Sequence, residues 1–194
     1  MAPNRMKTLY GVGVMGYGKY SSLTHRTAYD AWANMLERCY SPRCLKKHPT
    51  YIGCTVADEW HSFQNFVEWF DKNYIQGYHL DKDLTILGNK EYSPSTCVFV
   101  PRWLNNILLD SKASRGVYPV GVTYLDGKYR ARFSCNGVCS YLGLFGTPEL
   151  AYMAYCKAKG SYLIATASIK EIPEKIRHNL ALLGHQLIGG VPCP

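Results

Sequence analysis

The side chains best suited to catalysis lie in one stretch, residues 79–106. An acidic pair, Asp81 and Asp83, falls in a short β-like run that is followed by a Gly-Asn turn, a Ser-Pro turn and the strand-like sequence CVFV. A predicted helix comes next and carries Asn105 and Asn106. Mg²⁺ prefers hard oxygen ligands such as carboxylates and amides. Asp81 and one of the two asparagines are therefore predicted to hold Mg²⁺ or Mn²⁺, which would stabilise charge on a scissile phosphate.

Hydrolysis also needs a base that activates water, ideally a histidine whose pKa is near the working pH. The two candidates are Lys82 and His79, and His79 shares the face of Asp81 if the run is a strand. Lysine is a poor base at neutral pH unless desolvation or nearby cations depress its pKa. Three interpretations stay open. His79 replaces the base, or Lys82 contacts phosphate while water does the chemistry, or the site is inactive and the fold serves binding.

A structural zinc site is an alternative use of the cysteines. The chain has eight cysteines, and three of them could form a ligand group with one histidine. That candidate group is Cys39, Cys44, His48 and Cys54. Its spacing lacks the paired Cys-x-x-Cys units that are typical of zinc sites. The competing interpretation is that most of the cysteines are small buried apolar side chains.

The composition favours a polyanionic partner. The chain has 22 Lys and Arg residues against 14 Asp and Glu, a formal net charge of +8, and 16 tyrosines that recur beside basic residues. This balance favours a nucleic acid over an acidic protein or a small neutral ligand. No apolar segment has the length of a signal peptide or a membrane helix. We therefore expect a cytoplasmic protein with reduced thiols and no membrane association.

An α+β protein with two domains is predicted. Residues 1–24 form an arm without clear periodicity, and residues 25–110 form the first domain. The basic, polar segment 111–116 is the predicted linker. The second domain spans residues 117–166, and the tail, 167–194, contains an amphipathic segment to which we assign no function.

Apolar periodicity in the first domain predicts helices over residues 25–40 and 58–70. Between them we expect a basic loop and a short strand over residues 51–56. The basic residues of this loop are Arg43, Lys46, Lys47 and His48. The second helix is followed by the β-like run, turns and helix of residues 79–106.

The second domain is predicted to be a three-stranded antiparallel sheet with one helix packed on it. Strand-like runs at 121–124, 128–135 and 139–145 are separated by Asp-Gly and Asn-Gly, the strongest short-range hairpin signals. The sequence Thr-Pro-Glu at 147–149 then predicts the start of a helix.

Side chains of the middle strand alternate between the two faces of this sheet. Tyr129, Ala131 and Phe133 are expected to pack on the helix. The side chains expected on the open face are Arg130, Arg132, Ser134 and, from the next strand, Tyr141. A face with two arginines and an aromatic has the size and charge to enter the major groove of DNA. A solvated cationic face fits the same pattern.

About 50 residues of this region resemble the APETALA-type (ethylene-response-factor) DNA-binding domain. The matching residues are Gly121-Val122, Gly127-Lys128-Tyr129, Tyr141-Leu142-Gly143 with Phe145, Thr147 with Ala151, and Ala154-Tyr155. The resemblance implies that the sheet lies in the major groove. The contact positions that it implies are Thr123, Arg130, Arg132, Ser134, Cys139 and Tyr141, to which we add Lys128. Several positions that are Arg in plant members are Thr, Ser or Cys here, so the plant target sequence does not carry over.

Residues 29–106 resemble the HNH (His-Me finger) endonuclease-like proteins of bacteriophages. The matching stretches are WANMLERCY, VADEWHSFQNF, LDKD, YSPSTCVFV and NN. By this resemblance Asp81 takes the position of the metal-ligand acid and Asn105 that of the helical metal ligand. Lys82 takes the position of the general-base histidine, and Thr96 that of the asparagine that holds the loop.

The sequence thus predicts a DNA-binding protein of phage or mobile-element type, acting in the cytoplasm of an infected bacterium. As an enzyme it would be a homing endonuclease that nicks or cleaves double-stranded DNA by Mg²⁺-assisted hydrolysis, at a site chosen by the sheet domain. The alternative is a catalytically inactive DNA-binding regulator or host-takeover factor that keeps the nuclease fold. A third interpretation is an inhibitor that binds a host protein through its aromatic surface.

Overall fold

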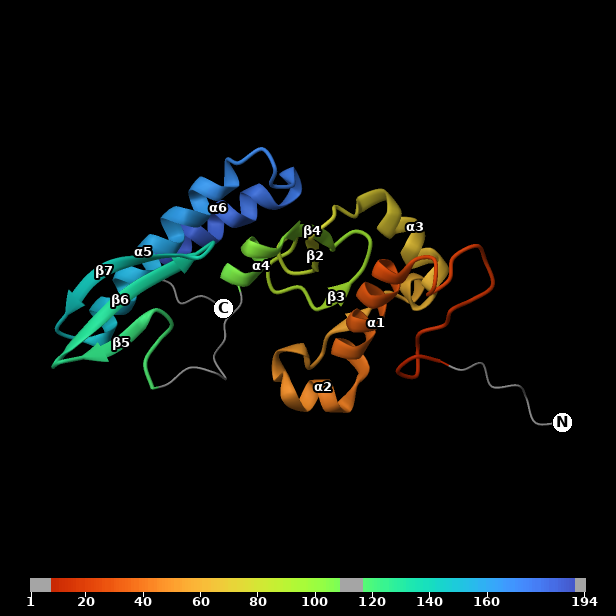
Figure 1. Ribbon diagram of the computed structural model, residues 1–194, viewed down its shortest axis with the longest axis horizontal. Coiled ribbons are helices and arrows are strands. Elements are labelled where there is room, and N and C mark those ends of the chain that lie inside the picture. Colours follow the sequence, from red (N-terminus) through yellow and green to blue (C-terminus); the bar gives the residue numbers. More distant parts are fainter. Residues whose placement is uncertain (1–7, 109–116, 191–194) are drawn as a thin grey trace. The chain divides into compact units, whose positions relative to one another are not determined.

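The chain divides into two compact units, Met1–Phe99 and Val100–Pro194. The structure is a computed structural model, and it describes residues 8–108 and 117–190 (Figure 1). The division between the units comes earlier in the chain than the predicted linker at 111–116, which lies outside the described residues.

Helices and short paired strands make up most of the described part of the first unit. Its helices are α1 (Arg26–Tyr40), α2 (Pro42–Lys47) and α3 (Phe63–Asn73), with 3₁₀ helices η1 (Pro49–Tyr51) and η2 (Asp58–His61). Its strands are β1 (Thr55–Val56), β2 (Tyr78–Asp81), β3 (Glu91–Tyr92) and the start of β4 (Val98–Pro101). Strand β1 pairs with β3 in parallel, and β2 pairs with β4 in a separate sheet.

Aromatic side chains at helical spacing form the core of this unit. Trp32 of α1, Trp60 of η2, and Phe63 and Phe66 of α3 are all fully buried. The indole N–H of Trp32 donates to the backbone oxygen of Trp60 over 2.7 Å, so the polar edge of this buried ring is satisfied. This bond fixes α1 against the turn that precedes α3.

The predicted helix over residues 58–70 is wrong at its start. Residues 58–61 form the 3₁₀ helix η2, and Ser62 is extended, with φ −82° and ψ 123°. The reason lies in the N-terminal arm, because Val14 bridges to Ser62 and its oxygen accepts from the N–H of Phe63 over 2.9 Å. The long-range pairing interrupts the helix, and α3 begins one residue later.

The predicted loop and strand between the two helices also differ from the structure. The loop contains α2, because the Ser41 hydroxyl accepts from the N–H of Cys44 and Pro42 occupies the first turn, where a proline starts a helix. The predicted strand over 51–56 is reduced to β1, because η1 and the left-handed Gly53 (φ +79°) take up the preceding residues.

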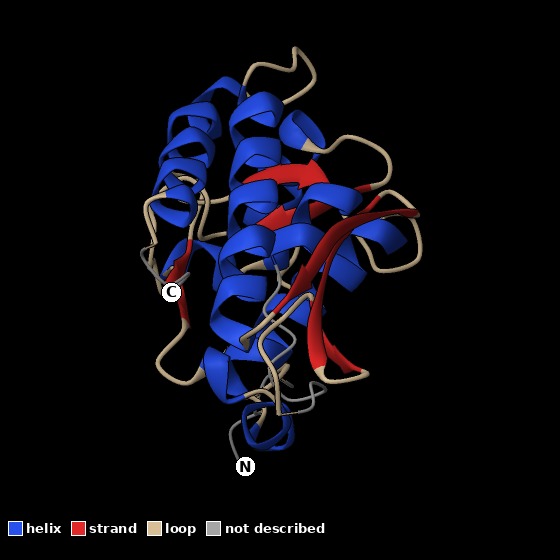
Figure 2. Ribbon diagram, turned by 90° about the vertical axis from the view of Figure 1, so that its left-hand side faces the viewer, coloured by secondary structure: helices blue, strands red, loops and turns tan. Residues whose placement is uncertain are grey.

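The described part of the second unit contains the three-stranded sheet and three helices. Its elements are α4 (Arg102–Leu108), β5 (Val122–Leu125), β6 (Lys128–Cys135), β7 (Val138–Phe145), α5 (Pro148–Ala167) and α6 (Glu174–Ile188). The strand order β5-β6-β7 is antiparallel, as predicted (strands in red, Figure 2). Both hairpin turns have left-handed backbone at their two central residues, Asp126-Gly127 and Asn136-Gly137.

Helix α5 covers one face of this sheet, which confirms the α+β class. Ala131 of β6 and Ala151 of α5 have no exposed surface, and the rings of Phe133 and Tyr155 meet edge to face at 5.9 Å. The hydroxyl of Thr147 accepts from the N–H of Leu150 over 3.3 Å, so the predicted cap forms. None of the helices within the described ranges is both long and apolar enough to span a membrane.

The tail of the chain is part of the second unit. Its amphipathic segment forms α6, which runs antiparallel to α5 and buries Ile176, Leu180 and Leu187. The two helices lie in close approach at Gly160 and Gly184, where a Cβ on either glycine would lie 2.5–2.6 Å from the other's backbone oxygen. A side chain at this crossing would force the helices apart.

We therefore expect Gly160→Val to lower the free energy of unfolding by about 1–3 kcal/mol, the usual cost of overfilling a packed interior. The matched control is Gly146→Ala, since a Cβ there would meet no atom within 4 Å. Urea denaturation followed by circular dichroism measures both. Equal urea midpoints for Gly160→Val and the wild-type protein would contradict the close approach of the two helices.

Candidate nucleic-acid interface

The open face of the sheet brings together the side chains that the sequence predicted there. The strand register places Arg130 between Thr123 and Leu144, and Arg132 opposite Tyr141. The remaining predicted contact residues also fall on this face: Lys128 at its end, and the neighbouring pair Ser134 and Cys139. Arg132 and Tyr141 are exposed, and Arg130 is half-buried among its neighbours.

Arg130 is oriented by its neighbour on β5. Its Nε donates to the hydroxyl of Thr123 over 3.3 Å, and no carboxylate of the described residues pairs with it. The bond uses one of the five guanidinium N–H groups, so the two terminal nitrogens stay free to bind an external acceptor. Arg132 forms no ion pair with a described residue either.

A β-bulge sets the direction of Tyr141. The register shifts between Ala131 and Arg132, so that Leu142 has no partner across the strands and packs on the core side of the sheet. Gly143 follows with φ +131°, a backbone conformation that L side chains rarely adopt. The bulge keeps Tyr141 beside Arg132 on the open face. The bulge was not predicted from the sequence, although a glycine inside a strand is the usual signal of one.

The charge of the open face is positive and unopposed. The three strands contain no Asp or Glu. The second unit as a whole has eleven of the 22 Lys and Arg residues but only five of the 14 Asp and Glu. A concentration of one sign of charge on one face produces the field that attracts a polyanion.

In the first unit, Asp81 ends β2 and holds the turn after it. Its Oδ1 accepts from the N–H of Asp83 over 2.9 Å and from that of Leu84 over 2.8 Å. Burial raises the pKa of the Asp81 carboxyl above its ordinary value, and the bond from Leu84 opposes this shift. His79, the alternative base, is exposed on the same strand, two residues earlier.

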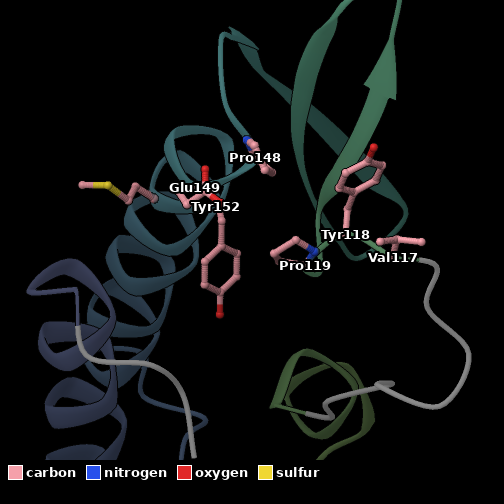
Figure 3. Close-up of a pocket in the computed structure, with 7 residues that line it drawn as sticks. Val117, Tyr118, Pro119, Pro148, Glu149 and Tyr152 are labelled. Carbon is pink, nitrogen blue, oxygen red and sulfur yellow. The ribbon is translucent and has the colours of Figure 1, made fainter.

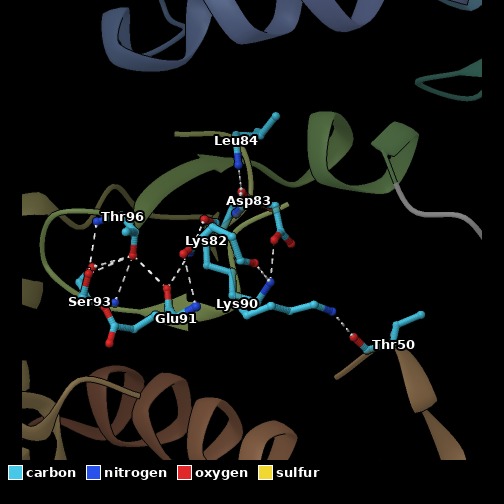
Figure 4. A network of polar contacts seen from close by, with 10 residues as sticks. Thr50, Lys82, Asp83, Leu84, Lys90, Glu91, Ser93 and Thr96 are labelled. Atoms are coloured by element: carbon cyan, nitrogen blue, oxygen red, sulfur yellow. Dashed lines mark hydrogen bonds and ion pairs between the residues drawn. The ribbon is translucent and has the colours of Figure 1, made fainter. Parts of the chain in front are cut away.

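Lys82 is buried inside the loop that follows Asp81 (Figure 4). Its ammonium donates to the backbone oxygen of Asn89 over 2.8 Å and to the carboxylate of Asp83, and it lies 5.7 Å from the centre of the Tyr92 ring. Because of these contacts, the ammonium of Lys82 points into the protein and away from solvent. The geometry gives Lys82 a structural role in the loop, and nothing in it supports the predicted contact with phosphate.

Asn89 holds the loop from the other side. Its Nδ2 donates to the backbone oxygens of Lys82 and Glu91 over 2.9 and 2.6 Å, and its Oδ1 accepts from the N–H of Glu91. Thr96, which the resemblance to HNH proteins places at their loop-holding asparagine, donates to the oxygen of Glu91 over 2.8 Å. From the sequence Asn89 was predicted only as a turn residue, because hydrogen bonds across seven residues leave no signal in the sequence.

Two metal sites were predicted from the sequence, one for Mg²⁺ at Asp81 and Asn105 and one for zinc at three cysteines and His48. Asp81 ends β2 in the first unit, and Asn105 lies on α4 near the start of the second, so the predicted Mg²⁺ site at these two residues stays a prediction. The part of the chain that is described contains no group of three or more His, Cys, Asp or Glu residues placed to hold a metal ion.

The four predicted zinc ligands, Cys39, Cys44, His48 and Cys54, are all described residues, and they form no group placed to hold a metal ion. Burial raises the pKa of the Cys39 thiol to about 12, which opposes the thiolate that zinc requires. We therefore assign no chemical step to a metal.

A pocket of about 390 Å³ lies in the second unit, between the start of α5 and the chain before β5 (Figure 3). The side chains that line it are mostly apolar and include those of Tyr118, Pro119 and Tyr152. Glu149 contributes the single carboxylate of the lining. Because α5 lies on the covered side of the sheet, the pocket is separate from the open face.

Comparisons with protein-family models, with curated proteins and with solved structures found no match to this chain. The likeness to the APETALA-type domain and to the HNH proteins therefore rests on the sequence motifs alone. What the protein does is inferred from the geometry and charge of its described surfaces.

The raised pKa of Asp81 gives a test of its role. A carboxyl whose pKa is raised by folding contributes stability below its unfolded pKa, and this contribution is lost as the pH rises through the folded value. Asp81→Asn keeps an oxygen that accepts both N–H groups, so we expect it to be at least as stable as the wild-type protein at pH 7 and to lack this pH dependence.

Asp81→Ala leaves the two N–H groups unsatisfied and should lower the free energy of unfolding by about 1–3 kcal/mol. Urea titrations between pH 3 and pH 7 measure all three proteins. A large loss of stability in Asp81→Asn would show that the charge of Asp81, rather than its acceptor atom, matters to the fold.

Proposed function

We propose that this protein binds double-stranded DNA through the open face of the β5-β6-β7 sheet. The observation that carries the proposal is the pair Arg130 and Arg132, which lie on the uncovered face with no carboxylate of the described residues beside them. Their alternation with the buried residues Ala131 and Phe133 fixes them on that side.

The dimensions of the sheet suit the major groove. Neighbouring strands lie roughly 4.8 Å apart, so three strands are roughly 10 Å wide between the outer backbones. The major groove of B-DNA is roughly 12 Å wide and admits elements of this size. Long side chains on the open face would then reach both base edges and the flanking phosphates.

The side chains on this face match the groups that the groove presents. An arginine binds guanine O6 and N7, or a phosphate, through two N–H groups. Tyr141 and Leu144, both exposed, offer apolar contact of the kind that recognises the thymine methyl group. Ser134 and Cys139 add short polar groups at the end of the face.

Cleavage of the bound DNA stays a prediction from the resemblance to HNH proteins. The buried, hydrogen-bonded Lys82 is not placed to act on a substrate, and Asp81 is the one predicted catalytic-site carboxylate held in a fixed position. Non-catalytic DNA binding requires no group beyond those on the open face. It is therefore the function that the described geometry supports best.

The double variant Arg130→Gln with Arg132→Gln tests the binding face. We expect its affinity for a duplex to fall at least about tenfold. The slope of log K against log salt should flatten by about 0.9 for each phosphate that the variant no longer neutralises. Fluorescence anisotropy with a 30-base-pair duplex at several salt concentrations gives both values.

The matched control for charge is Lys157→Gln with Lys170→Gln, two exposed lysines on the helical side of the same unit. This control should retain most of the affinity. If the arginine variant and the control bind DNA equally well, the open face is not the binding surface.

Plasmid relaxation separates a nuclease from a non-catalytic binder. Supercoiled plasmid with Mg²⁺ or Mn²⁺ is incubated with the wild-type protein and with Asp81→Asn, which is expected to fold normally. If the protein is a non-catalytic binder, we expect the wild-type protein and Asp81→Asn both to shift the mobility of the plasmid. Neither should relax it. Relaxation by the wild-type protein alone would instead establish DNA cleavage that depends on Asp81.

A further inference from the structure

A second basic surface lies on the first unit, on the short helix α2. Arg43, Lys46 and Lys47 occupy positions i, i+3 and i+4 of this helix, and residues at this spacing share one face. All three are exposed, whereas Cys44 and Leu45, on the other side, are half-buried. We call Arg43, Lys46 and Lys47 the α2 triplet.

The surroundings of the α2 triplet are also basic. The segment 38–57 contains no Asp or Glu, and the exposed His48 follows the helix directly. Lys90, from a distant part of the chain, is attached to the same segment, because its ammonium donates to the backbone oxygen of Thr50 over 3.0 Å. Folding thus adds a further positive charge to this region.

These charges have no internal partner among the described residues. Among the described residues, no ion pair and no side-chain hydrogen bond involves a side chain of the α2 triplet. Like charges at this spacing repel each other and destabilise a helix. Other cations of the unit differ in this respect: Arg26 pairs with Asp30 over 3.0 Å, and Lys19 lies near Glu68 and Asp71.

We infer that the α2 triplet is a second DNA-binding surface, which contacts backbone phosphates of a duplex and does not read its sequence. Two of its three members are lysines, which act on phosphate as point charges, and its helix is too short to offer a long recognition face. It rests on the proposed function in one respect only, namely that the polyanion is duplex DNA. It predicts contacts that are independent of base sequence.

The test is the triple variant Arg43→Gln, Lys46→Gln, Lys47→Gln in the full chain. We expect affinity for a 30-base-pair duplex to fall about tenfold or more at roughly 0.1 M salt, with the salt slope flattened by about 1–3. The effect should be the same for duplexes of unrelated sequence, because phosphates are common to all.

The matched control removes the same charge from the same unit: Lys19→Gln, Arg26→Gln, Lys72→Gln, cations that each have an acidic neighbour in space or sequence. Arg43→Lys provides a second control, since it keeps the charge and should bind almost as well as the wild-type protein. The circular dichroism spectrum and melting temperature report whether each variant is folded; the α2 triplet is exposed, so folding should be retained.

The outcomes separate this inference from the proposed function. If the α2 variant and its control bind equally, the inference fails, whatever the arginines of the sheet do. If the α2 variant alone weakens binding and the sheet variant does not, the inference holds and the sheet proposal fails. Weaker binding in both, with a further decrease when they are combined, supports two DNA contacts in one chain. A decrease confined to one duplex sequence would also overturn the inference.

Discussion

Burial of one face of the β5-β6-β7 sheet against α5 is the constraint on which the proposed interface depends. Because side chains alternate along a strand, placing Ala131 and Phe133 in the core forces Arg130 and Arg132 to the opposite side. A shift of register by one residue would exchange the two sets. The left-handed turns at Asp126-Gly127 and Asn136-Gly137 fix this register, so the hairpins specify the interface as well as the fold.

In the first unit, the stretch that resembles a nuclease motif forms a loop closed by its own hydrogen bonds. The carboxylate of Asp81, the ammonium of Lys82 and the amide of Asn89 are all bonded to backbone groups of that loop. Such bonds satisfy polar groups that would be costly to bury alone. Lys82, which the resemblance to HNH proteins places at the catalytic base, is bonded to the backbone of this loop and stabilises it.

The two basic surfaces differ in the chemistry that they offer. The sheet presents arginines with apolar neighbours on a broad face, a combination suited to base edges in a groove. Helix α2 presents a compact group of charges suited to phosphate alone.

The sequence by itself determined the elements whose signals are local. Both hairpin turns, the Thr147 cap, the alternation of β6 and the α+β class follow from neighbouring residues, because turn and cap preferences act over a few positions. The break of the predicted helix at Ser62 was decided by tertiary structure. So were the role of Lys82 and the attachment of Lys90 to the α2 region. These features depend on pairing between residues far apart in the chain, which no local pattern encodes.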